Sequence, residues 1–168
     1  MNGLNLFGWP GGGKTRTKYP VMVEHYALLS SAETLAFAKV FARRLERFPA
    51  CVFLEGPLGA GKTLFTRGLV FGLLGAKAAS QVKSPSFVLI NEYKGKEGPL
   101  VAHIDFYRLK GWKELLDEVL DYLSAPCLIV IEWPKSSQGF FVPHVRQAYN
   151  ISIEITGPSE RLFTVEEL

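Results

Sequence analysis

Short apolar runs and segments of helical periodicity alternate along most of the chain. Apolar runs of strand length occur at 21–29, 51–55, 87–93, 100–105, 127–131 and 150–156, with one more candidate at 161–165. Apolar residues that recur at helical spacing predict helices from about 31 to 48, at 62–74 and at 112–123. This alternation of strands and helices predicts an α/β fold.

Start and stop signals define several boundaries. Ser30, followed three residues later by Glu33, is a capping-box pattern that predicts the start of the first helix. Pro49 predicts the end of the same helix, and Gly75 is a natural C-terminal cap for the second one. Residues 135–142 are expected to form a loop.

Length and composition limit the classes of protein. The chain has 168 residues, 48% hydrophobic and 21% charged, which suits one domain with a sizeable core. No apolar run approaches the length of a membrane span, and the N-terminus has no signal-peptide pattern, so we expect a cytoplasmic protein without membrane contact. Cys51 and Cys127 lack metal-binding spacing. A net charge of +3 is too small to indicate a nucleic-acid-binding protein by itself.

The strongest motif follows the apolar run at 51–55. Residues 56–63 read GPLGAGKT, the G-x-x-x-x-G-K-[ST] phosphate loop, in its required context of strand, loop and helix. Its glycines allow backbone N–H groups to converge on phosphate oxygens, and the following helix adds its positive dipole end. We expect Lys62 to reach the β- and γ-phosphates of ATP and the Thr63 hydroxyl to ligate Mg²⁺. The nucleotide-binding residues predicted from this segment are Gly56, Pro57, Leu58, Gly59, Ala60, Gly61, Lys62, Thr63 and Leu64.

Residues 8–15, GWPGGGKT, satisfy the same pattern in the wrong context. Too few residues precede them to anchor a strand, and the polar residues that follow lead to Pro20 without an apolar face. We therefore interpret residues 1–20 as a flexible basic N-terminal tail and residues 21–168 as a single P-loop ATPase domain.

Two acidic residues stand at the ends of predicted strands, where ligands bind in open α/β sheets. Glu132 follows the run 127–131 in the manner of a Walker B acid, and Asp105 ends the strand at 100–105. Both are candidates for binding Mg²⁺ and orienting the nucleophile, although such acids also serve as turn caps. Trp133 could stack on a base or pack in the core.

The polar segment Ser84–Pro85–Ser86 lies where NTPases place a nucleotide-responsive loop. Its hydroxyls are candidates for contact with the γ-phosphate or Mg²⁺. An ordinary turn before a strand explains the same spacing about as well.

Four segments together resemble one family. GPLGAGKT at 56–63, VKSPSFVL at 82–89, HIDFYRL at 103–109 and IEWP at 131–134 have the order and spacing of TsaE, the bacterial P-loop protein required for tRNA threonylcarbamoyladenosine formation. The resemblance extends over roughly residues 24–157. The H-x-D-x-Y-R-L and E-W elements are specific to this family in a way that the phosphate loop is not.

The resemblance implies a P-loop NTPase-like fold with a mixed, mostly parallel sheet flanked by helices. It also implies an ATPase that works with TsaB and TsaD, which transfer the threonylcarbamoyl group to an adenosine beside the anticodon. TsaE does not perform that transfer, and its ATP hydrolysis resets the complex of the two partners. We expect any contact with tRNA to be indirect.

The resemblance also assigns roles by motif position. The implied catalytic residues are Glu132, Asp105 and Lys62, and the implied Mg²⁺ ligands are Thr63, Glu132 and Asp105. Ser84 to Phe87 correspond to a switch-like loop. Further nucleotide contacts are implied for Trp133, Thr34 and Ser86.

Three positions and one segment depart from the family pattern. Pro57 stands where an acid is frequent, Leu64 replaces a second threonine, and Ser86 replaces a threonine while keeping the hydroxyl. The segment Lys110–Glu114 lacks the acidic, glycine-containing pattern expected after Y-R-L, which bears on the partner surface.

The sequence thus predicts a slow, partner-stimulated ATPase of tRNA modification, since no arginine finger is evident in cis. One alternative is a P-loop kinase of small molecules or nucleotides, which would need an acceptor pocket and an arginine-bearing lid. Another is a nucleotide-gated scaffold with incidental hydrolysis. An RNA-binding module is a third, disfavoured by the weak net charge.

Overall fold

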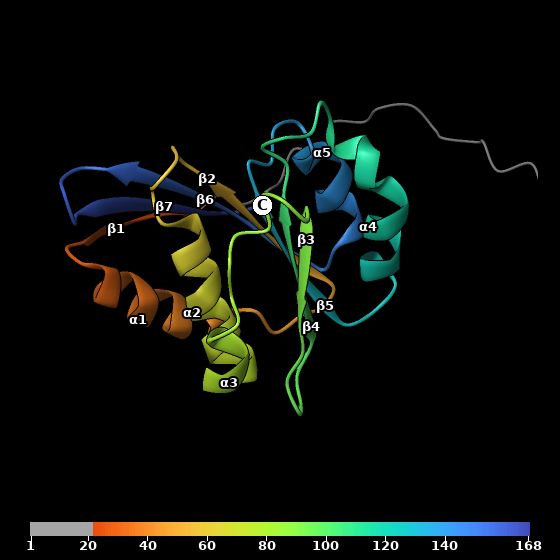
Figure 1. The fold of residues 1–168 in the computed structure, drawn as a ribbon, viewed down its shortest axis with the longest axis horizontal. Helices are drawn as coiled ribbons and strands as arrows, with labels where there is room; N and C mark the ends of the chain where they lie inside the picture. Colours follow the sequence, from red (N-terminus) through yellow and green to blue (C-terminus); the bar gives the residue numbers. More distant parts are fainter. Residues whose placement is uncertain (1–21) are drawn as a thin grey trace, which may run out of the picture.

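The computed structural model describes residues 22–168, so the predicted tail and the GWPGGGKT segment lie outside the described residues. Within residues 22–168, seven strands form one sheet in the order β1-β7-β6-β2-β5-β4-β3 (Figure 1). The strands are β1 (Val23–Leu28), β2 (Ala50–Glu55), β3 (Ile90–Tyr93), β4 (Leu100–Asp105), β5 (Cys127–Glu132), β6 (Gln147–Ile155) and β7 (Arg161–Glu167). Strands β6, β2, β5 and β4 run parallel, whereas the β1–β7, β7–β6 and β3–β4 pairings are antiparallel. The predicted α/β fold with a mixed sheet is confirmed.

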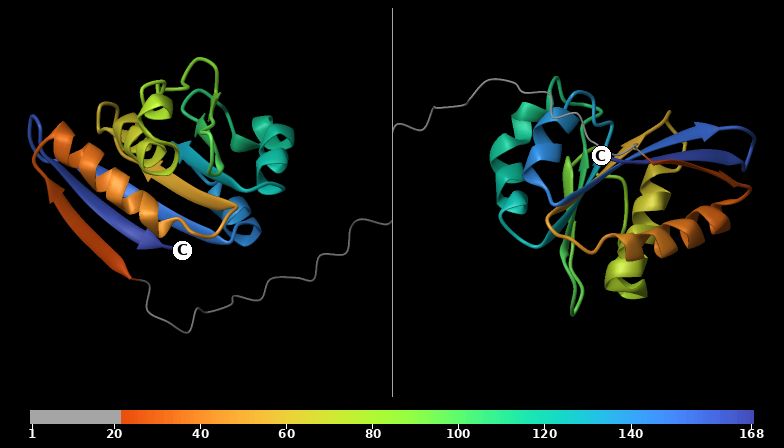
Figure 2. Two further views of the ribbon diagram at one scale, coloured as in Figure 1. Left: turned by 90° about the horizontal axis from the view of Figure 1, so that it is seen from below. Right: turned by 180° about the vertical axis from the view of Figure 1, so that it is seen from behind.

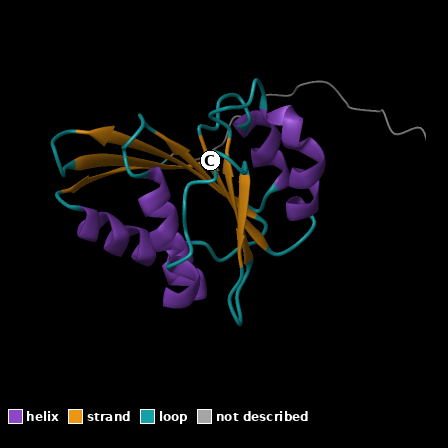
Figure 3. Cartoon of the chain, in the orientation of Figure 1, coloured by secondary structure: helices purple, strands orange, loops and turns teal. Residues whose placement is uncertain are grey.

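Helices cover both faces of this sheet (Figures 1 and 2). On one face lie α1 (Ser31–Phe41), its 3-10 extension η1 (Ala42–Arg44), α2 (Lys62–Leu74) and the short α3 (Ala76–Ala79). On the other lie η2 (Trp112–Leu115), α4 (Leu116–Leu123), α5 (Gln138–Phe141) and η3 (Val142–His144). The strands form a continuous twisted layer between the two groups (Figure 3). Within residues 22–168, no helix combines the length and apolar character needed to cross a membrane.

The central strand β2 supplies side chains to two hydrophobic cores. Val52 and Leu54 belong to the core shared with α1 and α2, and Cys51 and Phe53 to the core shared with α4 and α5. This follows from the strand period of two, which sends successive side chains to opposite faces. Because both faces are covered, the strand reads as a continuous apolar run.

Helices α1 and α2 approach each other closely through small residues. A Cβ atom added to Gly68 would lie 2.4 Å from Cβ of Ala38, and one added to Gly72 would lie 2.5 Å from Cβ of Ala42. Such distances leave no space for a side chain. The contact fixes the position of α2, whose first turn carries Lys62 and Thr63.

The first helix ends earlier than predicted, at Arg44 rather than near Phe48. The side chain of Gln147 explains this early end. Its Nε2 donates to the Arg44 carbonyl at 2.8 Å, and its Oε1 accepts from the Glu46 N–H at 3.2 Å. A side chain from β6 therefore satisfies backbone groups that the end of the helix leaves unpaired.

Three other boundaries were wrong. The strand predicted at 87–93 begins at Ile90, because the backbone N–H groups of Val88 and Leu89 donate to the Pro85 carbonyl in a turn. The strand predicted at 150–156 begins earlier, at Gln147, because this buried polar residue interrupts the apolar pattern at the start of the strand. The predicted loop at 135–142 contains α5 and the start of η3.

Candidate functional site

A cavity of about 460 Å³ lies at the carboxyl ends of β2, β5 and β4. The phosphate loop connects β2 to α2, while Glu132 and Asp105 are the last residues of β5 and β4. These two acids are direct partners in the parallel register of the strands. The residues lining the cavity are Leu58, Gly59, Gly61, Lys62, Thr63, Leu64, Ser84, Ser86, Asp105, Tyr107, Arg108, Glu132 and Trp133.

The phosphate loop needs glycine at two of its cavity-lining positions. Gly59 and Gly61 have φ angles of +78° and +107°, in the left-handed region that other residues rarely adopt. The guanidinium of Arg161, at the start of β7, braces this loop from outside the cavity. Its Nε donates to the Ala60 carbonyl at 3.0 Å and its Nη2 to the Gly59 carbonyl at 3.2 Å. The Ala60 carbonyl and the Gly61 N–H belong to the same trans peptide and point in opposite directions. The hydrogen bond from Arg161 to the Ala60 carbonyl therefore directs the Gly61 N–H away from Arg161.

Lys62 is buried at the base of the loop. Its ammonium group donates to the carbonyls of Gly56 at 2.8 Å and Pro57 at 3.0 Å, and lies 3.9 Å from the centroid of the Trp133 ring. Burial lowers the pKa of Lys62, against the opposing charges of Glu132 and Asp105. The two carbonyl oxygens thus occupy acceptor positions around the ammonium group that phosphate oxygens could take.

The carboxylate of Glu132 accepts two hydrogen bonds on the same oxygen. The Thr63 hydroxyl donates to Oε1 at 2.8 Å, and Nε2 of the fully buried His103 lies 2.8 Å from it. Burial opposes ionisation of Glu132, but the bonds to His103 and Thr63 and the Lys62 charge outweigh it and lower its pKa. Glu132 is therefore an ionised carboxylate held in one orientation.

Asp105 lies beside Glu132 but in a different environment. Its Oδ1 accepts from the backbone N–H of Tyr107 at 2.7 Å. Burial raises the pKa of Asp105, and the nearby Glu132 charge acts in the same direction. The two acids thus have pKa values shifted in opposite directions, which indicates different chemical roles.

An aromatic pair lies next to the phosphate loop. Trp133 has a φ of +57° and its ring centroid is 5.1 Å from that of Tyr107. A non-glycine residue in the left-handed region is strained, and such strain is most often found at functional sites. This conformation immediately after Glu132 brings the indole over Lys62.

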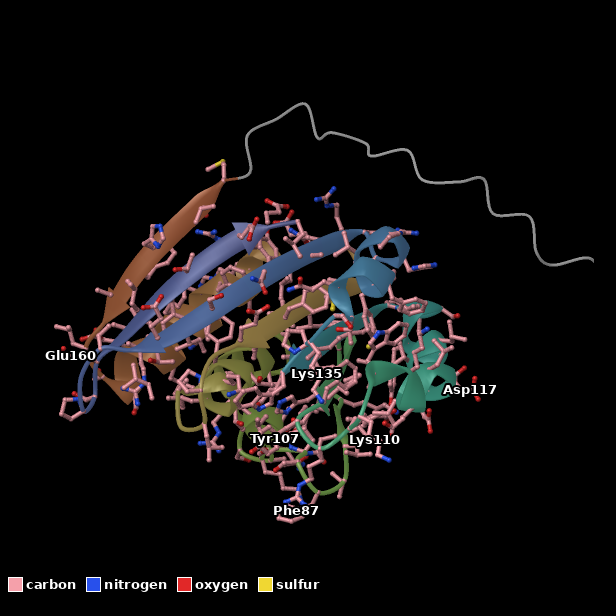
Figure 4. The ribbon with its side chains drawn as sticks, turned by 90° about the horizontal axis from the view of Figure 1, so that it is seen from above. Phe87, Tyr107, Lys110, Asp117, Lys135 and Glu160 are labelled. Carbon is pink, nitrogen blue, oxygen red and sulfur yellow. The ribbon has the colours of Figure 1, made fainter. Side chains whose placement is uncertain are left out.

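The predicted switch-like loop borders the same cavity. Ser84 and Ser86 line it, and their hydroxyl oxygens are 3.1 Å apart. Phe87 is 83% exposed. The Arg108 guanidinium lies over its ring, with Cζ 4.4 Å from the ring centroid. Figure 4 shows Phe87 and Tyr107 on the same side of the molecule.

The structure brings together most of the residues singled out in the sequence. Leu58, Gly59, Gly61, Lys62, Thr63, Leu64, Ser86, Asp105, Glu132 and Trp133 all line the cavity. Gly56, Pro57 and Ala60 support the loop without being part of the lining. Thr34 also lies outside the lining, in the first turn of α1, where its hydroxyl donates to the Ser30 carbonyl at 3.2 Å. Contact between Thr34 and a nucleotide stays a prediction.

Four residues of the site are missing from the predicted site residues. His103, Tyr107 and Arg108 belong to the HIDFYRL segment, but neither charge nor periodicity showed that His103 contacts Glu132 or that Tyr107 and Arg108 line the cavity. Arg161 is 100 residues from the phosphate loop in sequence, and only the topology of β7 brings it there. For Tyr107 and Arg108 the sequence did carry a signal, because their spacing from Asp105 places both at the carboxyl end of β4.

The oxygen and nitrogen donors of this cavity suit a polyphosphate and a hard divalent cation. Among the described residues, no cluster of three or more His, Cys, Asp and Glu side chains could hold a metal by itself. Mg²⁺ fits such a site, because it commonly takes one or two protein ligands together with phosphate oxygens and water. The Thr63 hydroxyl beside the Glu132 carboxylate provides that kind of ligand pair.

Comparison with known proteins gives a consistent answer. The family model described as threonylcarbamoyl adenosine biosynthesis protein TsaE matches residues 28–163. The chain is 38% identical to the Haemophilus influenzae tRNA threonylcarbamoyladenosine biosynthesis protein TsaE over 62% of this chain and 67% of that protein. It is 30% identical to the Rickettsia typhi protein of the same name over 84% and 94% of the two chains. The crystal structure of Bacillus subtilis YdiB superposes with a TM-score of 0.60 and 29% identity, covering 89% of this chain and 88% of the other. The chain belongs to the TsaE family.

Proposed function

We propose that this protein is a slow, partner-stimulated ATPase that acts in the formation of tRNA threonylcarbamoyladenosine. Family membership supports the role in tRNA modification, since the relatives carry that function in their names. The observation that supports ATP hydrolysis is the hydrogen bond between Thr63 of the phosphate loop and Glu132 at the end of β5, beside Lys62. Thr63, Glu132 and Lys62 thus lie together in one cavity, and phosphoryl transfer to water requires these three kinds of group.

In this proposal the phosphate loop holds the triphosphate of ATP. Lys62 exchanges its bonds to the carbonyls of Gly56 and Pro57 for bonds to phosphate oxygens. Thr63 and the carboxylates of Glu132 and Asp105 would hold Mg²⁺, which neutralises charge on the phosphate oxygens when bound. The cytoplasmic localisation expected from the sequence belongs to this proposal as well.

Glu132 orients the attacking water and accepts its proton. A bond forms between the water oxygen and the γ-phosphorus, the bond from the γ-phosphorus to the bridging oxygen breaks, and ADP leaves. Glu132 suits this role because it is ionised and held through Oε1. Asp105 supports the metal or the switch-like loop.

Turnover by the isolated protein is expected to be slow. Arg108 lines the cavity, but its guanidinium is stacked on the ring of Phe87. Many P-loop enzymes need a partner to complete the site. We propose TsaB and TsaD as these partners, with tRNA contacted indirectly.

The test is ATP hydrolysis by the purified protein, alone and with TsaB and TsaD, for wild type, Lys62→Ala and Glu132→Gln. We expect a low rate that rises with the partners, loss of binding in Lys62→Ala, and retained binding without turnover in Glu132→Gln. A phosphorylated small acceptor would show a kinase instead. Full pathway activity of Glu132→Gln would show a nucleotide-gated scaffold.

A further inference from the structure

We propose that His103 is a positioning residue that holds the Glu132 carboxylate by a hydrogen bond to Oε1, so that Oε2 stays directed at the attacking water. This inference rests on the proposed ATPase function. It assigns a role to His103, the first residue of the HIDFYRL segment. The proposed ATP hydrolysis does not otherwise use His103.

The position of His103 follows from the sheet. His103 and Asp105 are two residues apart on β4, so their side chains share one face of the sheet. In the parallel register, Asp105 lies opposite Glu132 on β5. On this face of the sheet, His103 is therefore the side chain next to Asp105 along β4, toward the inside of the protein, and none of its surface is exposed.

The surroundings of the imidazole indicate which nitrogen carries the proton. Nε2 is 2.8 Å from Oε1 of Glu132, whereas Nδ1 is buried and has no hydrogen-bond partner among residues 22–168. A carboxylate oxygen only accepts, so Nε2 must be the donor. Leaving Nδ1 as an unpaired acceptor rather than an unpaired N–H is the less costly arrangement, because orphaned buried donors are the rarer case. Packing alone would not place the polar edge of a histidine so close to Oε1.

Glu132 needs this second donor once the site is loaded. In the structure, Thr63 and His103 share Oε1. In the proposed function Thr63 would hold Mg²⁺ through its hydroxyl, and His103 would then be the donor that still fixes the Glu132 carboxylate. Without it, the carboxylate can rotate toward the Lys62 ammonium and lose its aim at the water.

A matched pair of polar variants tests this role. In His103→Gln the side-chain amide can reach the Nε2 position and donate to Glu132, whereas in His103→Asn it is one methylene too short. We expect His103→Gln to keep partner-stimulated turnover within about threefold and His103→Asn to lose about 10–100-fold, as for other second-layer partners of catalytic groups. Nucleotide affinity should stay within about threefold in both, so the effect falls on kcat.

A stability control separates positioning from packing. Val101→Ala removes buried volume from the same strand, two residues away, without touching Glu132. It should lower the melting temperature yet keep wild-type turnover. Equal turnover of the Asn and Gln variants, or an equal loss in Val101→Ala and His103→Asn, would overturn the proposal.

Nitrogen NMR of the imidazole tests the hydrogen bond independently of hydrolysis. We expect the signals of His103 in the full chain to show a protonated Nε2 and an unprotonated Nδ1, and to shift in Glu132→Ala. A protonated Nδ1 beside an unprotonated Nε2 would refute the positioning role even if the enzyme is active. Absence of wild-type hydrolysis with the partners would instead refute the ATPase proposal, whatever the NMR result.

Discussion

The ammonium group of Lys62 lies 3.9 Å from the centroid of the Trp133 ring. This cation–π contact joins the lysine that we propose binds phosphate to the residue directly after Glu132, and contacts of this kind are worth about 0.5–2 kcal/mol. A nucleotide that takes Lys62 for its phosphates must change the surroundings of the indole.

We therefore expect Trp133 to report nucleotide binding by its fluorescence. Addition of MgATP to wild type and to Trp112→Phe should change the emission, whereas Trp133→Phe should lose the response. Lys62→Met should also lose it, with nucleotide binding weakened about 100-fold, since charge-assisted hydrogen bonds contribute about 1.5–3 kcal/mol each. A response that vanishes in Trp112→Phe and persists in Trp133→Phe would contradict this assignment.

Arg161 should affect nucleotide affinity more than catalysis. Replacement by Met removes the braces on the carbonyls of Gly59 and Ala60. We expect nucleotide affinity to fall about tenfold, since two hydrogen bonds are each worth on the order of 1 kcal/mol. Calorimetric titration with ADP would measure it. The control is Arg146→Met, an exposed arginine directly before β6, at the opposite end of that strand from the Arg161 partner Ile155. An equal loss of affinity there would show that net charge, not bracing, is responsible.

The close contact between α1 and α2 makes Gly68 intolerant of a methyl group. Gly68→Ala should destabilise the protein by about 1–3 kcal/mol through overpacking against Ala38, although alanine is the better helix former. Gly139→Ala in α5 is the matched control, because its added Cβ would meet no atom of the described part of the chain within 4 Å. It should be neutral or stabilise by up to about 1 kcal/mol. Urea unfolding of both variants measures the difference, and a stable Gly68→Ala would show that the helices can separate at little cost.

The Glu24–Arg44 ion pair should contribute to stability above pH 4.5 and lose its contribution toward pH 2. Hydrogen bonds from Arg44 and Tyr26 lower the pKa of Glu24 to about 2, from 4.5. Because the folded state has the lower pKa, the unfolded chain takes up protons first as the pH falls through this window. The pair is partly exposed, so Glu24→Gln should cost about 0.5–1 kcal/mol at pH 7. Melting temperatures of wild type and variant should converge at low pH, and a constant difference would contradict the prediction.

The sequence was sufficient for the central part of the fold. The strand, phosphate loop and helix from Ala50 to Leu74 carry strong local signals, and the acids Asp105 and Glu132 were placed by their position at strand ends. These features depend on residues close together in the chain. The family resemblance then supplied the mixed sheet, which periodicity does not determine.

The errors arose where a specific hydrogen bond overrides the pattern of apolar residues. Gln147 ends the first helix from β6, which no pattern around Arg44 reveals. The turn at Pro85 replaces the start of a strand by pairing the backbone of Leu89 with the Pro85 carbonyl, which leaves Leu89 at a φ of +67°. The bond between His103 and Glu132 depends on the register of two parallel strands, a quantity that the sequence does not state.

That register has a consequence for how the family can vary. The spacing of Asp105 and Glu132 is set by backbone hydrogen bonds between β4 and β5, and β4 also carries His103. Deletion of Ile104, or an insertion between His103 and Asp105, would put the two side chains on opposite faces, and a one-residue shift of the whole strand would turn both to the other face. A substitution changes one side chain at a time, whereas any of these changes would displace at least one of the two groups from its place beside Glu132. Length differences among relatives should therefore be confined to segments such as the turn between β3 and β4, away from these strand ends.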